Sequence, residues 1–259
     1  MAYKYLAHIE YCLKHNYIPY VDMQFARTMY SGSGIKNPWG LFFDNPQYHG
    51  LLKYQWIISD PGKGKQVVSE AELFGCYWAL GFDRYAEKGE FIRTHLEINP
   101  EILRQVDEYS AEYDTSNCIG LYLRGTDYVS LKPKGHYIQP DLKEVFPVVD
   151  SFLNEYKGKI LLVTEDKSYC SQLQERYGER LIVALPTNMI ENYEEKKALS
   201  YTIEKQDILQ NAREYFIKIL LLARCRYLIA GKTNGSLMAL LFNGGEYEKI
   251  HLFDKGLYE

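Results

Sequence analysis

The sequence predicts an α/β protein with a doubly wound parallel sheet in its C-terminal half. From residue 117 onward, short apolar runs alternate with longer segments whose apolar residues have helical spacing. The runs carry few charges before their last residues, which is typical of parallel strands buried on both faces. Strands that alternate with helices in this way form parallel sheets with helical crossovers. The 259 residues are enough for two modest domains.

The N-terminal half is less regular. We expect, in chain order, a helix over 2–15, a strand over Tyr17–Val21 that ends at Asp22, an irregular segment rich in Gly, Pro and Asn over 28–65, and helices over Glu70–Leu80 and Glu101–Tyr113. Asp-Thr-Ser at 114–116 precedes the first clear strand, so we place a domain boundary there. The two predicted domains are residues 1–115 and 116–259.

The C-terminal half has a clear alternation of elements. Strands are expected at Asn117–Arg124, Lys159–Thr164, Arg180–Leu185, Tyr227–Gly231 and Lys249–Phe253, and helices from Pro140 onward and at Ser168–Tyr177, Ile208–Cys225 and Asn234–Asn243. Proline is favoured in the first turn of a helix. We expect Ser168 to be an N-cap and Gly178 to end its helix.

The composition excludes some classes of partner. The net charge of −4 argues against a general nucleic-acid binder, because phosphate neutralisation needs clustered Lys and Arg. The five cysteines are scattered and include no C-x-x-C pair, so neither a disulfide framework nor a zinc site is expected. We expect them to be reduced and buried in a cytoplasmic protein.

No targeting or membrane-spanning segment is expected. The N-terminus lacks a basic region followed by an apolar stretch. The most apolar segment, Phe216 to Gly231, is interrupted by Lys218, Arg224 and Arg226, which is not the pattern of an integral membrane segment.

The most informative stretch is the end of the first C-terminal strand, where an apolar run containing Tyr122 gives way to Arg124-Gly125-Thr126-Asp127-Tyr128. Ligands of open α/β sheets bind outside the carboxyl ends of the strands, and a guanidinium there suits a phosphate or diphosphate. Gly125 would let the backbone approach a ligand, and Asp127 would orient Arg124 or the loop. The alternative is an ion pair between Arg124 and Asp127 with only a structural role.

A second polar motif, Thr164-Glu165-Asp166-Lys167-Ser168, closes the next strand. The carboxylates of Glu165 and Asp166 could orient Arg124 or accept hydrogen bonds from ligand hydroxyls. Helix capping by Asp166 or Ser168 is the alternative explanation for an acidic residue at this place.

The third motif, Gly231-Lys232-Thr233-Asn234-Gly235-Ser236, joins a strand to a helix. Small and hydroxyl residues at a helix N-terminus leave free N–H groups that bind anions, and simple helix capping is the alternative. The Gly-Lys-Thr tripeptide is not a P-loop. The Walker pattern requires Gly at position 226, where the chain has Arg226.

The loop over 132–140 leaves the first strand on the same edge of the sheet. Lys132 and Lys134 would add positive charge there, and His136 could act as a base or a hydrogen-bond donor. No carboxylate lies between Asp127 and Asp141.

These motifs resemble those of the fucosyltransferase superfamily that includes the α1,6-, bacterial α1,2- and protein O-fucosyltransferases. The resemblance covers residues 117–259 well and the N-terminal half more loosely, through Tyr17 to Asp22. It implies a GT-B-like fold of two Rossmann-like domains, with an N-terminal α/β acceptor-side domain over 1–115 and a nucleotide-sugar-binding domain over 116–259. In that family the arginine matched by Arg124 holds the β-phosphate of GDP-fucose. Serines or threonines matched by 233–236 contact the nucleotide phosphates.

The chain departs from the family at several positions. Related enzymes place a Glu base near position 132, which is Lys132 here, and an Asp that contacts the nucleotide where this chain has Lys218, with Glu214 one turn earlier. The first motif of relatives often has His where this chain has Tyr122. Relatives also carry a Gly-containing strand and loop before the first helix, so we expect a shortened N-terminus.

The sequence therefore predicts an inverting, metal-independent glycosyltransferase in the bacterial cytoplasm. It would transfer fucose from GDP-fucose to a glycan acceptor in surface or capsular polysaccharide synthesis. No D-x-D motif occurs, so positive side chains rather than a metal ion are expected at the diphosphate, and no cofactor is expected. One alternative is a non-catalytic nucleotide-sugar or glycan-binding protein, and another is a small-molecule kinase or phosphatase.

The expected site residues fall into two groups. Arg124 and His136 are the expected catalytic residues, with Asp22 and Glu165 as further possibilities for the base. The expected substrate-binding residues are Tyr122, Gly125, Thr126, Asp127, Glu165, Asp166, Thr233, Asn234, Gly235, Ser236 and Asp22.

Overall fold

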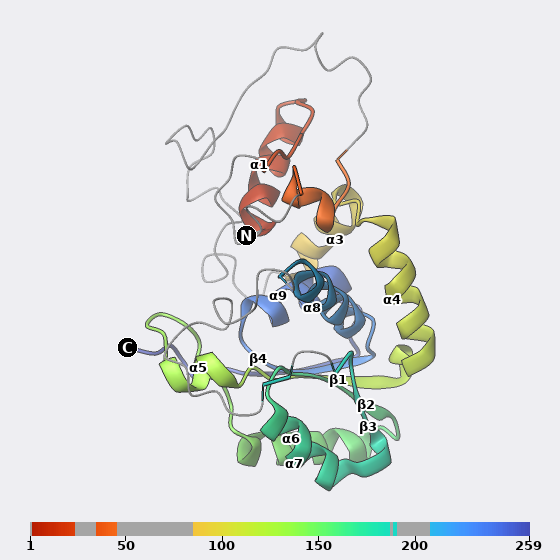
Figure 1. Cartoon of the computed structure of the whole chain (residues 1–259), viewed down its shortest axis with the longest axis vertical. Coiled ribbons are helices and arrows are strands. Elements are labelled where there is room, and N and C mark those ends of the chain that lie inside the picture. The colour runs from red at the N-terminus through yellow and green to blue at the C-terminus, as the bar shows by residue number, and fades with distance from the viewer. Residues whose placement is uncertain (1, 24–34, 46–84, 187–188, 191–207) are drawn as a thin grey trace.

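The structure is a computed structural model that describes residues 2–23, 35–45, 85–186, 189–190 and 208–259 (Figure 1). A five-stranded sheet forms its centre, in the order β3-β2-β1-β4-β5. The strands are β1 (Cys118–Tyr122), β2 (Lys159–Val163), β3 (Leu181–Val183), β4 (Tyr227–Gly231) and β5 (Lys249–Phe253). Every neighbouring pair is parallel, so the predicted α/β class and parallel sheet are confirmed.

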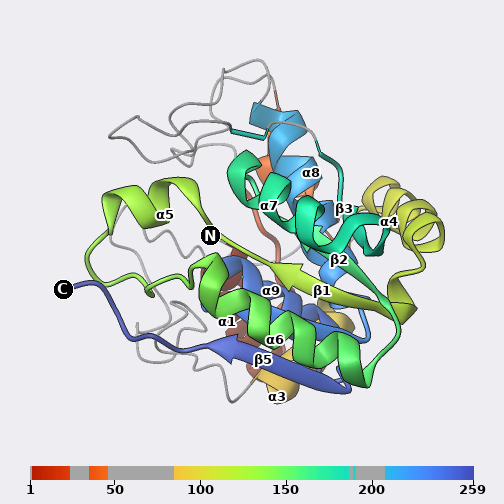
Figure 2. The same cartoon turned by 90° about the horizontal axis from the view of Figure 1, so that it is seen from below.

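Helices cover both faces of the sheet. Helices α6 (Leu142–Glu155) and α7 (Lys167–Tyr177) lie on one face, and α8 (Ile208–Ala223) and α9 (Asn234–Asn243) on the other (Figures 1 and 2). Side chains of β1 alternate between the two layers: Ile119 packs in the core under α6, whereas Tyr122 packs in the core under α8 and α9. The sheet is thus doubly wound, as predicted.

The strand order reverses beside β1. The chain leaves β1 toward β2 on one side of the sheet and leaves β4 toward β5 on the other. Loops that diverge in this way open a crevice at the carboxyl ends of the strands, where open α/β sheets bind ligands. The loop that follows β1 and the loop that follows β4 therefore flank this switch point.

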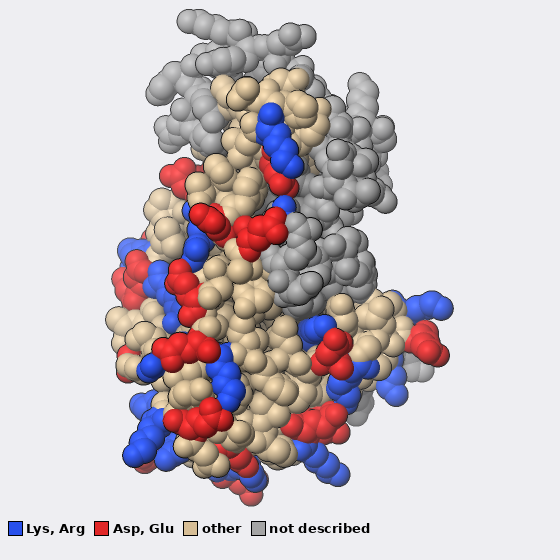
Figure 3. All heavy atoms as spheres, turned by 180° about the vertical axis from the view of Figure 1, so that it is seen from behind, with Lys and Arg blue, Asp and Glu red and all other residues tan. Residues whose placement is uncertain are grey.

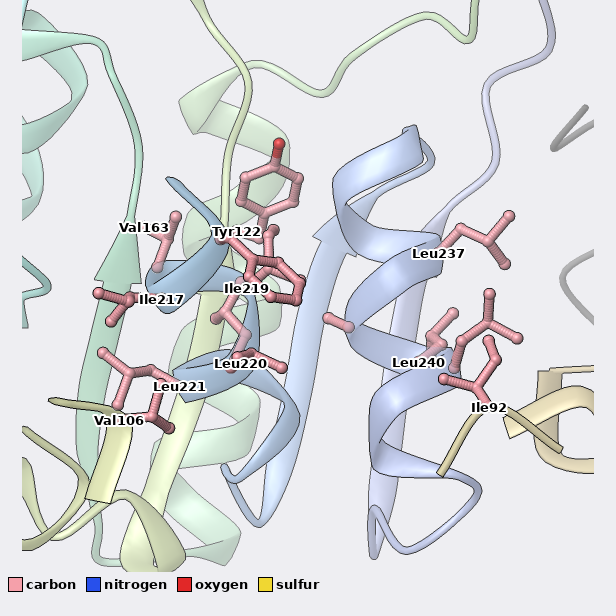
Figure 4. Packing of buried hydrophobic residues seen from close by; sticks show 14 of the residues in the cluster. Ile92, Val106, Tyr122, Val163, Ile217, Ile219, Leu220, Leu221, Leu237 and Leu240 are labelled. Atoms are coloured by element: carbon pink, nitrogen blue, oxygen red, sulfur yellow. The ribbon is translucent and has the colours of Figure 1, made fainter. Parts of the chain in front are cut away.

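The N-terminal part of the chain packs on the α8–α9 face. Its elements are α1 (Ala2–Lys14), the 3₁₀ turn η1 (Pro38–Leu41), α3 (Tyr85–His95), α4 (Pro100–Tyr113) and the 3₁₀ turn η5 (Thr115–Asn117). Ile92 of α3 lies beside Leu240 of α9, and Val106 of α4 lies near Leu221 of α8 (Figure 4). These buried residues belong to one core with the sheet.

The predicted strand over Tyr17–Val21 is wrong. The segment joins no strand of the described residues, and the backbone groups of Val21 bond to asparagine side chains instead. Val21 N–H donates to Asn45 Oδ1 at 3.0 Å, and Val21 O accepts from the amides of Asn37 and Asn45, each at 2.8 Å. The helix expected over Glu70–Leu80 lies outside the described residues.

Helix α3 was not expected from the sequence, and Gly89 explains why. Glycine in a helix interior is less favourable than alanine by about 1 kcal/mol. A Cβ at Gly89 would lie 2.5 Å from Leu241 O of α9. The glycine therefore allows α3 to pack closely on α9, and this tertiary contact stabilises a helix of weak local propensity.

The surface carries charges of both signs. On the face shown in Figure 3, the described Lys and Arg side chains are interspersed with Asp and Glu. That face therefore offers no extended basic surface among its described residues, and nucleic acids bind to such surfaces. Of the helices that the structure describes, none combines the length and apolar character needed to cross a membrane.

Candidate functional site

Arg124 lies just beyond the carboxyl end of β1, at the switch point. Its Nη2 donates to Asp127 Oδ1 at 3.1 Å, and its Nε lies 3.4 Å from Glu165 Oε1. The side chain is 18% exposed. Within the described part of the chain, no group accepts a hydrogen bond from Nη1. The ion pair between Arg124 and Asp127 thus forms, and one edge of the guanidinium has no acceptor among the described residues.

The neighbouring acids keep Arg124 charged. Burial alone would lower the pKa of Arg124, but the charge of Glu165, with a smaller contribution from Asp127, more than offsets it, so the pKa lies well above its ordinary value. Arg124 is therefore a fixed positive charge at the edge of the sheet.

The residues after Arg124 form a tight turn into the short helix α5 (Thr126–Leu131). Thr126 has φ of 40°, a left-handed conformation that strains a β-branched residue. Its buried hydroxyl donates to Glu165 Oε1 at 2.9 Å. The structure thus brings Arg124, Thr126, Asp127 and Glu165 together, as the motifs predict, and joins the loops that follow β1 and β2.

Asp166 caps helix α7. Its Oδ1 accepts from Tyr169 N–H at 3.1 Å, and its Oδ2 accepts from Thr126 N–H at 3.4 Å. The capping explanation of the second motif therefore holds for Asp166, while the expectation that Ser168 is the N-cap is wrong because Ser168 lies inside the helix. Gly178 ends α7, as predicted.

The N-terminus of α9 is closed by a capping box. Thr233 Oγ1 accepts from the N–H groups of Gly235 at 3.1 Å and Ser236 at 3.2 Å, and Ser236 Oγ accepts from Thr233 N–H at 2.8 Å. The expectation of free N–H groups at Gly235 and Ser236 is therefore wrong. Asn234 is half-buried, and the other predicted binding residues of this helix start, Thr233, Gly235 and Ser236, are buried. The partial positive charge of the helix N-terminus remains.

Two tyrosines lie against this helix end. The hydroxyls of Tyr122, at the end of β1, and Tyr215, on α8, are 3.2 Å apart. A Cβ at Gly235 would lie 2.5 Å from each hydroxyl, so the glycine makes room for both. Tyr122 points its hydroxyl away from the aliphatic side chains below it (Figure 4). Sequence reasoning missed Tyr215, because in its helix it is one aromatic residue among many apolar ones.

Helix α8 also carries the two charged residues that differ from the expected pattern. Glu214 is 8% exposed and accepts from Gln210 Nε2 at 2.7 Å. Burial lowers the pKa of Lys218, while Glu214 and Glu165 act in the opposite direction. The charge of Glu165 therefore acts to raise the pKa of both Lys218 and Arg124.

His136 is connected to Arg124 through a residue that was not expected in the site, Tyr128 of α5. The Tyr128 hydroxyl lies 3.2 Å from His136 Nδ1. The guanidinium carbon of Arg124 lies 4.9 Å from the centre of the Tyr128 ring. Tyr128 thus stands between the two expected catalytic residues. Tyr128 is the last residue of the first motif, and this position is the sequence signal that could have identified it as a site residue.

Asp22 is not linked to Arg124 by an ion pair, and its role stays a prediction. It is exposed, in the extended segment that follows Val21. In the described ranges, no three His, Cys, Asp or Glu residues gather in a way that could hold a metal ion.

A cavity of about 630 Å³ lies at the opposite edge of the sheet, at the amino ends of β1, β2 and β4. Tyr113, Tyr156 and Tyr227 line it, and its Arg226 and Glu248 pair with each other. We assign the candidate site to the carboxyl edge instead, because parallel sheets bind their ligands there and because Arg124 has an open edge.

The comparisons with known proteins concern the fold. No protein-family model and no curated protein sequence matches the chain. Its fold is similar to the crystal structure of the fucosyltransferase NodZ from Bradyrhizobium, with a TM-score of 0.53 and 11% identity over 91% of this chain and 86% of the other. NodZ alpha-1,6-fucosyltransferase soaked with GDP-fucose gives 0.52 and 12% over 92% and 86%, and its co-crystal with GDP gives 0.51 and 11% over 92% and 85%. The protein therefore has a fucosyltransferase-like fold, as its motifs predict.

Proposed function

We propose that this protein is a glycosyltransferase that transfers fucose from GDP-fucose to a glycan acceptor with inversion. The observation that carries the proposal is Arg124, a half-buried cation at the switch point, one edge of whose guanidinium has no acceptor among the described residues. A diphosphate placed there would accept hydrogen bonds from Arg124 and lie near the positive N-terminus of α9. Structures of similar fold were soaked with GDP-fucose or co-crystallised with GDP, which supports this choice of donor.

In this proposal Arg124 stabilises the negative charge that develops on the diphosphate as the sugar leaves. The reaction needs no metal ion, because Arg124 and α9 supply the positive charge. Residues 116–259 bind the donor and residues 1–115 bind the acceptor, in a GT-B arrangement of two domains. We place the reaction in the bacterial cytoplasm, in the synthesis of a surface or capsular polysaccharide.

Calorimetric titration tests the proposal. GDP and GDP-fucose should bind more tightly than UDP, and EDTA should leave their affinities unchanged. The absence of nucleotide binding at millimolar concentration would rule out the transferase. Loss of binding in EDTA would instead contradict metal independence.

A non-catalytic nucleotide-sugar or glycan-binding protein is the second candidate. It is favoured by the loop between Asp127 and Asp141, which has no carboxylate to act as a base. This candidate predicts that GDP-fucose binds but releases no GDP with any member of a panel of glycan acceptors.

A further inference from the structure

We propose that Tyr128 and His136 form a proton relay that takes the proton from the attacking hydroxyl, an inference that rests on the proposed glycosyl transfer. The two side chains meet at a hydroxyl-to-Nδ1 distance of 3.2 Å, with their rings edge to face and their centres 5.3 Å apart. The Tyr128 ring also lies over the Arg124 guanidinium. A nucleophile bound by Tyr128 would therefore lie next to a diphosphate bound by Arg124.

The carboxylates of this edge already have other partners. Asp127 accepts from Arg124, and Glu165 accepts from Thr126 and faces Arg124. Asp166 caps α7. Each carboxylate is thus engaged with a cation or a hydrogen-bond donor of the turn. Tyr128 and His136 meet beside these contacts, with the Tyr128 ring against Arg124.

The C-terminal tail holds His136 in place. Gly135 N–H donates to Tyr258 O at 2.8 Å, Tyr258 N–H donates to His136 O at 2.9 Å, and Ile138 N–H donates to Gly256 O at 3.0 Å. The tail therefore runs antiparallel to the loop that carries His136, and the C-terminus lies near α5 (Figures 1 and 2). Such a fixed base loses little entropy when it takes part in the reaction.

The relay balances in atoms and charge. The hydroxyl of the acceptor, or of water, loses its proton to the Tyr128 oxygen, while the Tyr128 proton passes to His136 Nδ1. The acceptor oxygen forms a bond to the anomeric carbon, and the bond from that carbon to the β-phosphate oxygen breaks, leaving its electron pair on the diphosphate. Tyr128 stays neutral, His136 ends as a cation, and Arg124 stabilises the negative charge that develops on the diphosphate.

The test uses GDP-fucose with water as the acceptor, so no glycan has to be known. GDP release gives kcat, and calorimetry with GDP gives the affinity. Tyr128→Phe keeps the ring over Arg124 and removes the hydroxyl, and His136→Ala removes the imidazole. His95→Ala and Tyr109→Phe, on α3 and α4, are the matched controls.

We expect Tyr128→Phe and His136→Ala each to lower kcat about 100-fold, with GDP affinity unchanged within about twofold. The double variant should lose no more than either single one, since both act in one relay. Added imidazole should restore activity to His136→Ala and not to Tyr128→Phe. The control variants should match the wild type.

Three outcomes would overturn the relay: wild-type kcat in either single variant, losses that multiply in the double variant, or a loss of GDP affinity as large as the loss of kcat. A wild type that binds GDP but releases none from GDP-fucose would overturn the relay and leave nucleotide binding intact. A wild type that binds no GDP would overturn the proposed function, and the relay with it.

Discussion

Gly125 lies directly against Asp166: a Cβ at Gly125 would come within 2.4 Å of Asp166 Oδ2 and 2.8 Å of Asp166 Cβ. The same carboxylate caps α7 through Tyr169 N–H. The turn that follows β1 and the start of α7 therefore fix each other. Because Arg124 immediately precedes this turn, the close contact also sets the position of its side chain.

Gly125→Ala should lower the free energy of unfolding by about 1–3 kcal/mol, because Asp166 must move and its cap weakens. GDP affinity should fall as well, since Arg124 shifts. Urea denaturation measures the first effect and calorimetry the second. Gly40→Ala is the matched control. A Cβ there meets no atom within 4 Å, so we expect a change below about 0.5 kcal/mol. Equal tolerance at both positions would contradict the close contact.

Arg124→Ala should weaken GDP binding by at least about 2 kcal/mol, because a charge-assisted hydrogen bond to the diphosphate is lost. Arg124→Lys should recover only part of this loss, since lysine lacks the planar fork of arginine. Arg104→Ala, whose side chain is 55% exposed on α4, controls for a general effect of lost positive charge. Affinity that stays at the wild-type value in Arg124→Ala would remove Arg124 from the site.

The strands of the C-terminal half could be predicted because a buried parallel strand has a local signature. The predicted ranges Tyr227–Gly231 and Lys249–Phe253 coincide with β4 and β5. The third strand is shorter than expected, at Leu181–Val183, and each of its three residues pairs with a residue of β2. An apolar run in the sequence does not reveal over how many residues the neighbouring strand will pair with it.

The N-terminal half depends on partners that are distant in the sequence. The segment ending at Val21 is rich in aromatic and β-branched residues, which favour strands, yet the backbone of Val21 bonds to Asn37 and Asn45. Helix α3 depends on the fit of Gly89 against Leu241. Local propensity reports neither contact.

The site could be predicted in part. Arg124, Asp127 and Glu165 follow adjacent parallel strands, so the sheet itself brings them together. Spacing along the chain does not show that Tyr215 of α8 would meet Tyr122, or that the tail would hold His136. Those relationships arise from packing between elements that are far apart in the sequence.

Gln139 links the two loops of the switch point, which leads to a third prediction. Its Nε2 donates to Tyr137 O at 2.9 Å and to Lys232 O at 3.0 Å, and the residue is 5% exposed. Gln139→Met keeps the side-chain volume but leaves two enclosed carbonyls without this donor. We expect the free energy of unfolding to fall by about 1–3 kcal/mol in urea denaturation.

Gln172→Met, on the exposed side of α7, is the control for Gln139→Met and should change the stability little. A Gln139→Met variant that is as stable as this control would show that the link between the loops contributes nothing.

Glu144 gives the last prediction, which concerns pH. Its carboxylate pairs with Lys255 of the C-terminal tail and accepts from Asp141 N–H in the capping box of α6. Lys255, followed by the Asp141 N–H, lowers the pKa of Glu144 below its ordinary value. A carboxyl group whose pKa is lower in the folded state stabilises the protein above its unfolded pKa of about 4.3, and this contribution disappears as the pH falls through the folded pKa.

Glu144→Gln keeps the capping hydrogen bond and removes only the charge. The variant should therefore lower the free energy of unfolding by less than about 1 kcal/mol at pH 7, as expected for an exposed ion pair. In the acid range the variant and the wild type should have the same free energy of unfolding. Urea denaturation at both pH values measures this, with Glu175→Gln on the exposed side of α7 as the control. A difference that is the same at both pH values would mean that the charge of Glu144 is not responsible.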